Sequence, residues 1–134
     1  MPRLYREAPL NGIWEGSGNV ICLDVLRAVS KTPVVLEVFF ERLNNIQGES
    51  KQLDQRIHDL KEGFHHKKYG QYQARYVTEE MAIILQAALL IQHGHPAVRN
   101  AFLLSRIDNQ WGRAFGTLPA MVATNEIINR AWQG

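Results

Sequence analysis

The chain has 134 residues, of which 46% are hydrophobic and 21% charged, the composition of a single soluble globular domain. Its formal net charge of +2 excludes nucleic-acid binding that rests on overall charge, so binding of that kind would need a local basic cluster. The single cysteine, Cys22, excludes an internal disulfide and a metal site built on cysteine pairs.

Cys22 lies in an apolar run, which predicts a buried thiol in a protein of the reducing cytoplasm. The N-terminal residues lack the apolar segment of a signal peptide. The most hydrophobic stretch, residues 81–91, is too short to span a bilayer. We therefore expect a cytoplasmic protein with no membrane partner.

The first third of the chain carries helical signals. Residues 3–8 are predicted to form a short turn or a helix that Pro9 ends. Asn19 is a predicted N-cap, and residues 20–31 repeat apolar side chains at helical spacing.

Two more helices are predicted in the middle of the chain. Thr32 followed by Pro33 is a start signal for a helix that is expected to end at Gly48. Its predicted apolar face consists of Leu36, Phe39, Phe40, Leu43 and Ile46. Ser50 is a predicted cap of the next helix, whose apolar residues recur every three or four positions. These residues are Leu53, Ile57, Leu60 and Phe64.

Three helices are predicted in the second half, after a change of direction at Gly70. They cover residues 72–92, 97–107 and 123–132. The first of them is apolar nearly all round over residues 81–91, which predicts a place at the centre of a bundle. Strand and hairpin signals are nearly absent. The predicted fold class is therefore all-α, a helical bundle.

One short stretch, IWEGSGNV at residues 13–20, raises a question of chemistry because it places Glu15 between Trp14 and three small residues. An acid at the start of a helix is stabilised by the helix dipole, and spacing alone favours this structural interpretation. The alternative is a catalytic base, since a carboxylate beside an aromatic side chain can be desolvated, as general-base catalysis requires. The small residues would also let a ligand approach the backbone and the free N–H groups of the helix start.

Residues 56–75 carry five cationic and two anionic side chains, a net charge of +3 against +2 for the whole chain. The cationic residues are Arg56, Lys61, Lys67, Lys68 and Arg75. Binding of nucleic-acid phosphates is one interpretation, and a solvated helix face is the one the pattern favours. The five histidines have no cysteine nearby and a single carboxylate at ligand spacing, so we expect no metal site.

The sequence resembles the C-terminal part of acyl-CoA dehydrogenases. Residues 3–8 read RLYREA and residues 13–20 read IWEGSGNV, where that family has RLYRDA, a short spacer and IYEGTSE/QI. The variant here, followed by CLDVLR at residues 22–27, is similar to the AidB branch of flavoproteins linked to DNA alkylation. ARYVTE at residues 74–79 and WGRAFGTLP at residues 111–119 resemble the extra C-terminal helices of that branch.

The resemblance implies a role for each residue of the stretch. Glu15 matches the base that removes the α-proton of an acyl-CoA thioester while FAD takes the β-hydride. Gly16 matches a position beside the thioester, and Trp14, which replaces the usual tyrosine, is expected to narrow the substrate channel. Ser17, Gly18 and Asn19 match positions that contact FAD, although they differ from the family's Thr-Ser-Glu/Gln.

The resemblance also implies a division of the chain. Residues 1–31 match the end of the C-terminal helical domain of the dehydrogenase, and residues 32–134 match the appended AidB-type helices. The family's β-domain is missing, so we expect a part of a longer, homo-oligomeric FAD flavoprotein that is inactive alone. The alternative is a DNA-binding or oligomerisation module.

Overall fold

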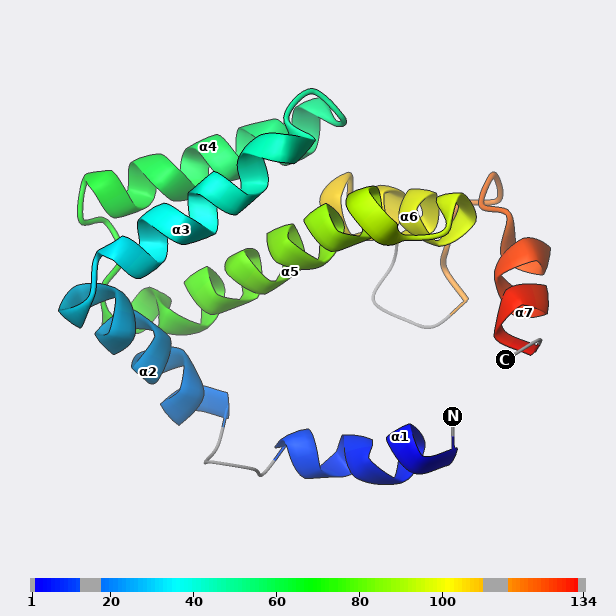
Figure 1. The fold of residues 1–134 in the computed structure, drawn as a ribbon, viewed down its shortest axis with the longest axis horizontal. Helices are drawn as coiled ribbons and strands as arrows, with labels where there is room; N and C mark the ends of the chain where they lie inside the picture. The colour runs from blue at the N-terminus through cyan, green and yellow to red at the C-terminus, as the bar shows by residue number, and fades with distance from the viewer. Residues whose placement is uncertain (1, 13–17, 110–115, 133–134) are drawn as a thin grey trace. The chain divides into compact units, whose positions relative to one another are not determined.

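The computed structural model describes residues 2–12, 18–109 and 116–132. Within these ranges the chain is all-α and contains no strand, which confirms the predicted fold class and is consistent with a helical bundle. Figure 1 traces the helices along the chain. They are α1 (Pro2–Glu7), α2 (Gly18–Lys31), α3 (Val34–Leu43), α4 (Lys51–His65), α5 (Ala74–His93), α6 (Pro96–Phe102) and α7 (Thr124–Trp132). Short 3₁₀ helices cover Ala8–Gly12, Asn44–Ile46 and Gln71–Gln73, and a π-helix covers Leu103–Ile107.

The predicted cap at Ser50 is confirmed, whereas the N-cap predicted at Asn19 is wrong, because α2 already begins at Gly18 and the Oδ1 of Asn19 accepts a hydrogen bond from Arg75. Ser50 accepts a hydrogen bond at its Oγ from the backbone N–H of Leu53 at 3.3 Å, which caps α4. His95 caps α6, because its Nδ1 accepts from the backbone N–H of Ala97 at 3.3 Å, and Pro96 is the first residue of that helix.

The chain divides into two compact units. The first unit consists of Met1–Arg42 with Leu60–Met81, and the second of Leu43–Asp59 with Ala82–Gly134. The core of the first unit contains Phe40, Leu60, Ala74 and Val77. The predicted division at residue 31 concerns family origin and stays a prediction.

The second unit has the larger set of buried apolar residues. They include Leu43, Ile46, Leu53, Ile57, Ile84, Ala87, Ala88, Ala97, Ala101, Ile107 and Val122. Complete burial of α5 was a wrong expectation, because Leu85 and Leu89 on its other face are 36% and 43% exposed. Helix α5 therefore buries one face only. A sequence that is apolar nearly all round does not indicate which face that is.

The chain turns after α4 at a residue other than the predicted one. Lys67 has a φ of 52°, in the left-handed region, whereas Gly70 has an extended backbone. The backbone N–H of Lys68 donates to the Gly63 carbonyl at 2.9 Å, and Tyr69 folds back over the buried Gly63. The Tyr69 ring meets the Phe64 ring edge-on, with centroids 5.1 Å apart.

We expect Gly63→Ala to destabilise the protein by about 1–3 kcal/mol, although alanine ordinarily favours a helix over glycine. A Cβ at this position would overlap the Tyr69 ring. Urea unfolding measures the cost, and a double-mutant cycle with Tyr69→Leu isolates the clash. A cost that is unchanged when the tyrosine ring is removed would contradict the packing described here.

Candidate functional site at the start of helix α2

The start of helix α2 is the described part of the predicted catalytic stretch. Trp14, Glu15, Gly16 and Ser17 lie outside the described residues. Gly18 is the first residue of α2, and a Cβ added to it would meet nothing within 4 Å. The first backbone N–H groups of a helix have no partner within the helix, so this end offers donors in open space.

Asn19, the second predicted FAD contact in the described region, has a partner within the protein. Its Oδ1 accepts a hydrogen bond from Nε of Arg75 at 3.2 Å, and both side chains are exposed. Arg75 lies in the first turn of α5, 56 residues further along the chain. The sequence predicts Arg75 as part of the basic cluster. It does not predict the bond to Asn19, because the spacing of neighbouring residues does not indicate contacts between distant ones.

A shallow cavity of about 640 Å³ lies along α2 in the first unit. It is lined by Val20, Leu23, Asp24, Leu26, Arg27, Ser30, Tyr69, Gly70 and Gln71. None of the residues of α2 is buried, and Cys22, which we expected to be buried, is half-buried. The described residues therefore bury the apolar face of α2 only in part.

These features fit one wall of a cofactor site. Gly18 leaves space for a ligand against the backbone, and the start of α2 provides N–H donors for an acceptor such as a phosphate or a carbonyl oxygen. The described residues do not enclose a flavin, because every residue near this end of α2 is exposed or half-buried.

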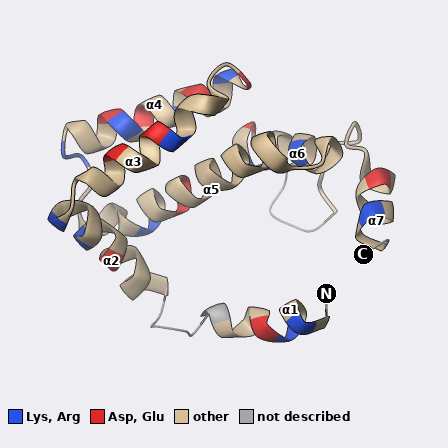
Figure 2. Ribbon diagram, in the orientation of Figure 1, with Lys and Arg blue, Asp and Glu red and all other residues tan. Residues whose placement is uncertain are grey.

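The five basic residues proposed for nucleic acid are divided between the two units. Arg56 belongs to the second unit, and its Nη1 donates to the Arg106 carbonyl at 2.6 Å. Arg75, in the first unit, donates to Asn19. Lys61, Lys67 and Lys68 are exposed in the first unit. Figure 2 shows lysines and arginines spread over most of the described helices.

The histidines do not converge on a metal-binding arrangement in the part of the chain that the structure describes. No group of three or more His, Cys, Asp or Glu side chains suited to a metal ion occurs there. His66, the residue after the end of α4, instead lies 3.3 Å from Glu62 of that helix, and His95 lies 3.4 Å from Glu126 on α7.

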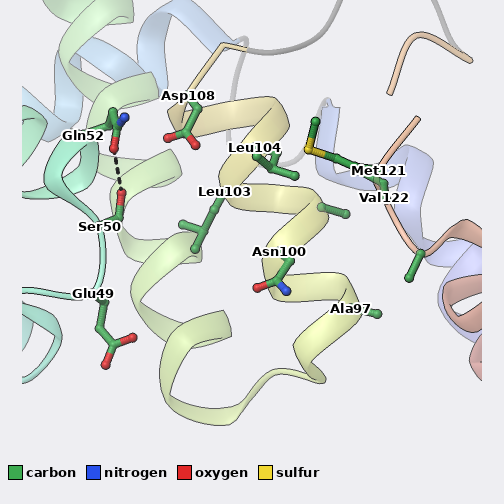
Figure 3. Close-up of a pocket in the computed structure, with 12 residues that line it drawn as sticks. Glu49, Ser50, Gln52, Ala97, Asn100, Leu103, Leu104, Asp108, Met121 and Val122 are labelled. Carbon is green, nitrogen blue, oxygen red and sulfur yellow. Dashed lines mark hydrogen bonds between the residues drawn. The ribbon is translucent and has the colours of Figure 1, made fainter. Parts of the chain in front are cut away.

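A second cavity, of about 560 Å³, lies in the second unit beside α6 and the π-helix. Figure 3 shows Leu104 directed toward Met121 on one side, and Asn100 at the front. Asp108 also lines it, and its Oδ1 is buried without a hydrogen-bond partner among the described residues. None of the predicted site residues lines this cavity. This cavity was not predictable from local sequence patterns, because it depends on how the segment before α7 packs.

No helix within the described ranges combines the length and the apolar character needed to cross a membrane. No family model matches the chain. It is 31% identical over 112 residues, 84% of its length, to the protein named "Putative acyl-CoA dehydrogenase AidB" of Escherichia coli (strain K12). It is 39% identical over 62 residues, 46% of its length, to "Acyl-CoA dehydrogenase family member 11" of Caenorhabditis elegans.

The chain spans 20% of the length of the Escherichia coli protein and 10% of the length of the Caenorhabditis elegans protein. Both relatives carry the same family name, and the first match extends over most of the chain. The chain is therefore an AidB-like region of the acyl-CoA dehydrogenase family.

Proposed function

We propose that this chain supplies the catalytic base of an FAD-dependent flavoprotein that oxidises acyl-CoA thioesters between their α- and β-carbons. The observation that carries the proposal is the similarity over 112 residues to the Escherichia coli protein. The stretch at residues 13–20 supports it, because its family counterpart carries the base and it leads directly into α2.

The proposed roles follow the sequence of the stretch. Glu15 accepts the α-proton of the thioester on its carboxylate, and Gly16 and Trp14 border the acyl-CoA. FAD, when bound, provides the acceptor for the β-hydride. Gly18 and Asn19, with Ser17 before them, hold one edge of the cofactor, which agrees with the open backbone at Gly18.

We further propose that the chain is inactive alone. Flavin chemistry requires a site from which water is excluded, and α2 has no buried residue among those described. The single cysteine, Cys22, agrees with a protein of the reducing cytoplasm. The exposed apolar residues Leu85 and Leu89 of α5 support assembly into a homo-oligomer.

A chimera tests this function. In it, the chain replaces the matching fifth of the Escherichia coli relative, which supplies the remaining domains. We expect the purified chimera to contain FAD and its visible flavin absorbance to be lost on anaerobic addition of butyryl-CoA or octanoyl-CoA. The isolated chain should bind FAD with a dissociation constant above about 1 mM. A FAD-loaded chimera that no acyl-CoA reduces would contradict the proposal.

The alternative function, DNA binding, is supported by the exposed Lys61, Lys67 and Lys68. If these three lysines contact phosphates, log K should fall with log salt with a slope of about −3. Changing all three to glutamate should abolish binding to a duplex. The control changes Lys31, Lys51 and Arg130 to glutamate, which alters the net charge by the same amount. Absence of binding at low salt, or equal loss in both variants, would show that the three lysines form only a solvated face.

A further inference from the structure

Arg75 lies outside the predicted catalytic stretch, and the structure connects it to Asn19 within that stretch. We propose that Arg75 is a positioning residue: it fixes the side-chain amide of Asn19 so that the amide nitrogen faces the cofactor. This inference rests on the function proposed above and identifies the residue that prepares one of its cofactor contacts.

The chemistry of the contact defines the orientation of the amide. Arginine has only N–H donors, so the Asn19 atom that lies 3.2 Å from Nε of Arg75 must be the carbonyl oxygen. The amide nitrogen of Asn19 then keeps both N–H groups for another partner. A residue in the first turn of α2 thereby presents donors alone, which suits a flavin carbonyl or a phosphate oxygen.

Arg75 extends from a well-fixed turn, which makes it a suitable support. Ala74, directly before it, and Val77, two positions after it, are 1% and 0% exposed. The backbone N–H of Gly70 donates to Oε1 of Gln73 at 3.0 Å and holds the turn that precedes α5. The bond from Arg75 to Asn19 therefore ties the start of α2 to an anchored helix start in the same unit.

This bond also connects the two predicted parts of the chain. Asn19 belongs to residues 1–31, which match the dehydrogenase domain, and Arg75 belongs to the appended helices. The appended helices would then set the orientation of a group at the flavin end of α2.

Two substitutions of Arg75 separate its donor from its charge. In Arg75→Gln, the amide nitrogen stands at the same point of the side chain as Nε, so the donor remains and the charge is lost. In Arg75→Lys, a methylene group stands at that point and the ammonium donors lie one atom further out, so the charge remains and the donor at the position of Nε is lost. Arg27→Ala is the matched control, because Arg27 is an exposed arginine of α2 that pairs with Asp24 at 2.6 Å.

The first experiment uses the ¹⁵N-labelled 134-residue chain and needs no cofactor. We expect Arg75→Ala and Arg75→Lys to shift the side-chain amide signals of Asn19. In both variants hydrogen exchange in the first turn of α2 should become about threefold faster or more, because the local opening equilibrium rises. Arg75→Gln and Arg27→Ala should resemble the unchanged chain. An Arg75→Ala variant that differs no more than the Arg27→Ala control would overturn the inference, whatever the function of the protein.

The second experiment measures FAD affinity in the chimera. The FAD dissociation constant should rise about three- to tenfold in Arg75→Ala and Arg75→Lys and stay nearly unchanged in Arg75→Gln. Asn19→Asp, which keeps the acceptor for Arg75 and removes the donors, should weaken FAD binding while the first turn of α2 stays protected. If FAD binding is instead unchanged in Arg75→Lys and weakened in Arg75→Gln, the charge of Arg75 and not its donor matters. That result would overturn the inference even if Glu15 is the base.

Discussion

Replacing Glu15 with glutamine in the chimera should lower the rate of flavin reduction by an acyl-CoA by about 10²-fold or more, the usual share of a general base. Glutamine has nearly the same shape as glutamate but does not accept a proton at neutral pH. FAD content and acyl-CoA binding should stay close to those of the unchanged chimera, because the substitution removes only the proton acceptor. Anaerobic stopped-flow absorbance measures the rate in a single turnover.

Glu7→Gln provides the matched control for this substitution. Glu7 is an exposed glutamate of α1, eight positions before Glu15 in the sequence, and its Oε1 lies 3.1 Å from Nε of Arg3. Its loss should change the rate less than twofold, since surface ion pairs contribute little. A Glu15→Gln variant that reduces flavin at the unchanged rate would remove Glu15 from the mechanism. Equal losses in both variants would assign the effect to general damage.

Ile84→Ala should be the most destabilising of the substitutions considered, with a cost of about 2–5 kcal/mol in the free energy of unfolding. Ile84 is 0% exposed and lies in the core of the second unit, so its truncation removes buried methyl groups and leaves a cavity. Urea unfolding of the 134-residue chain, followed by circular dichroism, measures the loss.

The neighbouring residue supplies the comparison. Leu85 follows Ile84 on α5 and is 36% exposed, so Leu85→Ala should cost about 1 kcal/mol or less. Equal costs at the two positions would contradict the one-sided burial of α5, and a larger cost at Leu85 would reverse it.

The helices could be predicted because their signals are local. Each of these signals acts within one or two helical turns. The structure confirms the cap at Ser50, the helix start at Thr32–Pro33 and the apolar spacing of Leu53 and Ile57. The face of α5 that would be exposed was not predictable, because residues 81–91 are apolar nearly all round. The π-helix at Leu103–Ile107 also has no signal in the spacing of its residues.

The candidate site was predicted for a different reason. Spacing alone favours a helix-start acid at Glu15, and only the resemblance to the dehydrogenase family implies a base there. The contacts between distant residues were not predictable from the local sequence. Arg75 lies 56 residues from Asn19, and Arg56 lies 50 residues from the Arg106 carbonyl that it contacts. Both arginines had been grouped by charge, whereas the structure gives each a partner within the protein.

Proton removal from the substrate tests the central claim most directly, because it follows the base itself. The FAD-loaded chimera is incubated with butyryl-CoA in deuterated water, and deuterium at the α-carbon is measured by mass spectrometry. We predict incorporation by the unchanged chimera and only the uncatalysed background with Glu15→Gln. Equal incorporation by the two proteins would contradict the assignment of Glu15 as the base.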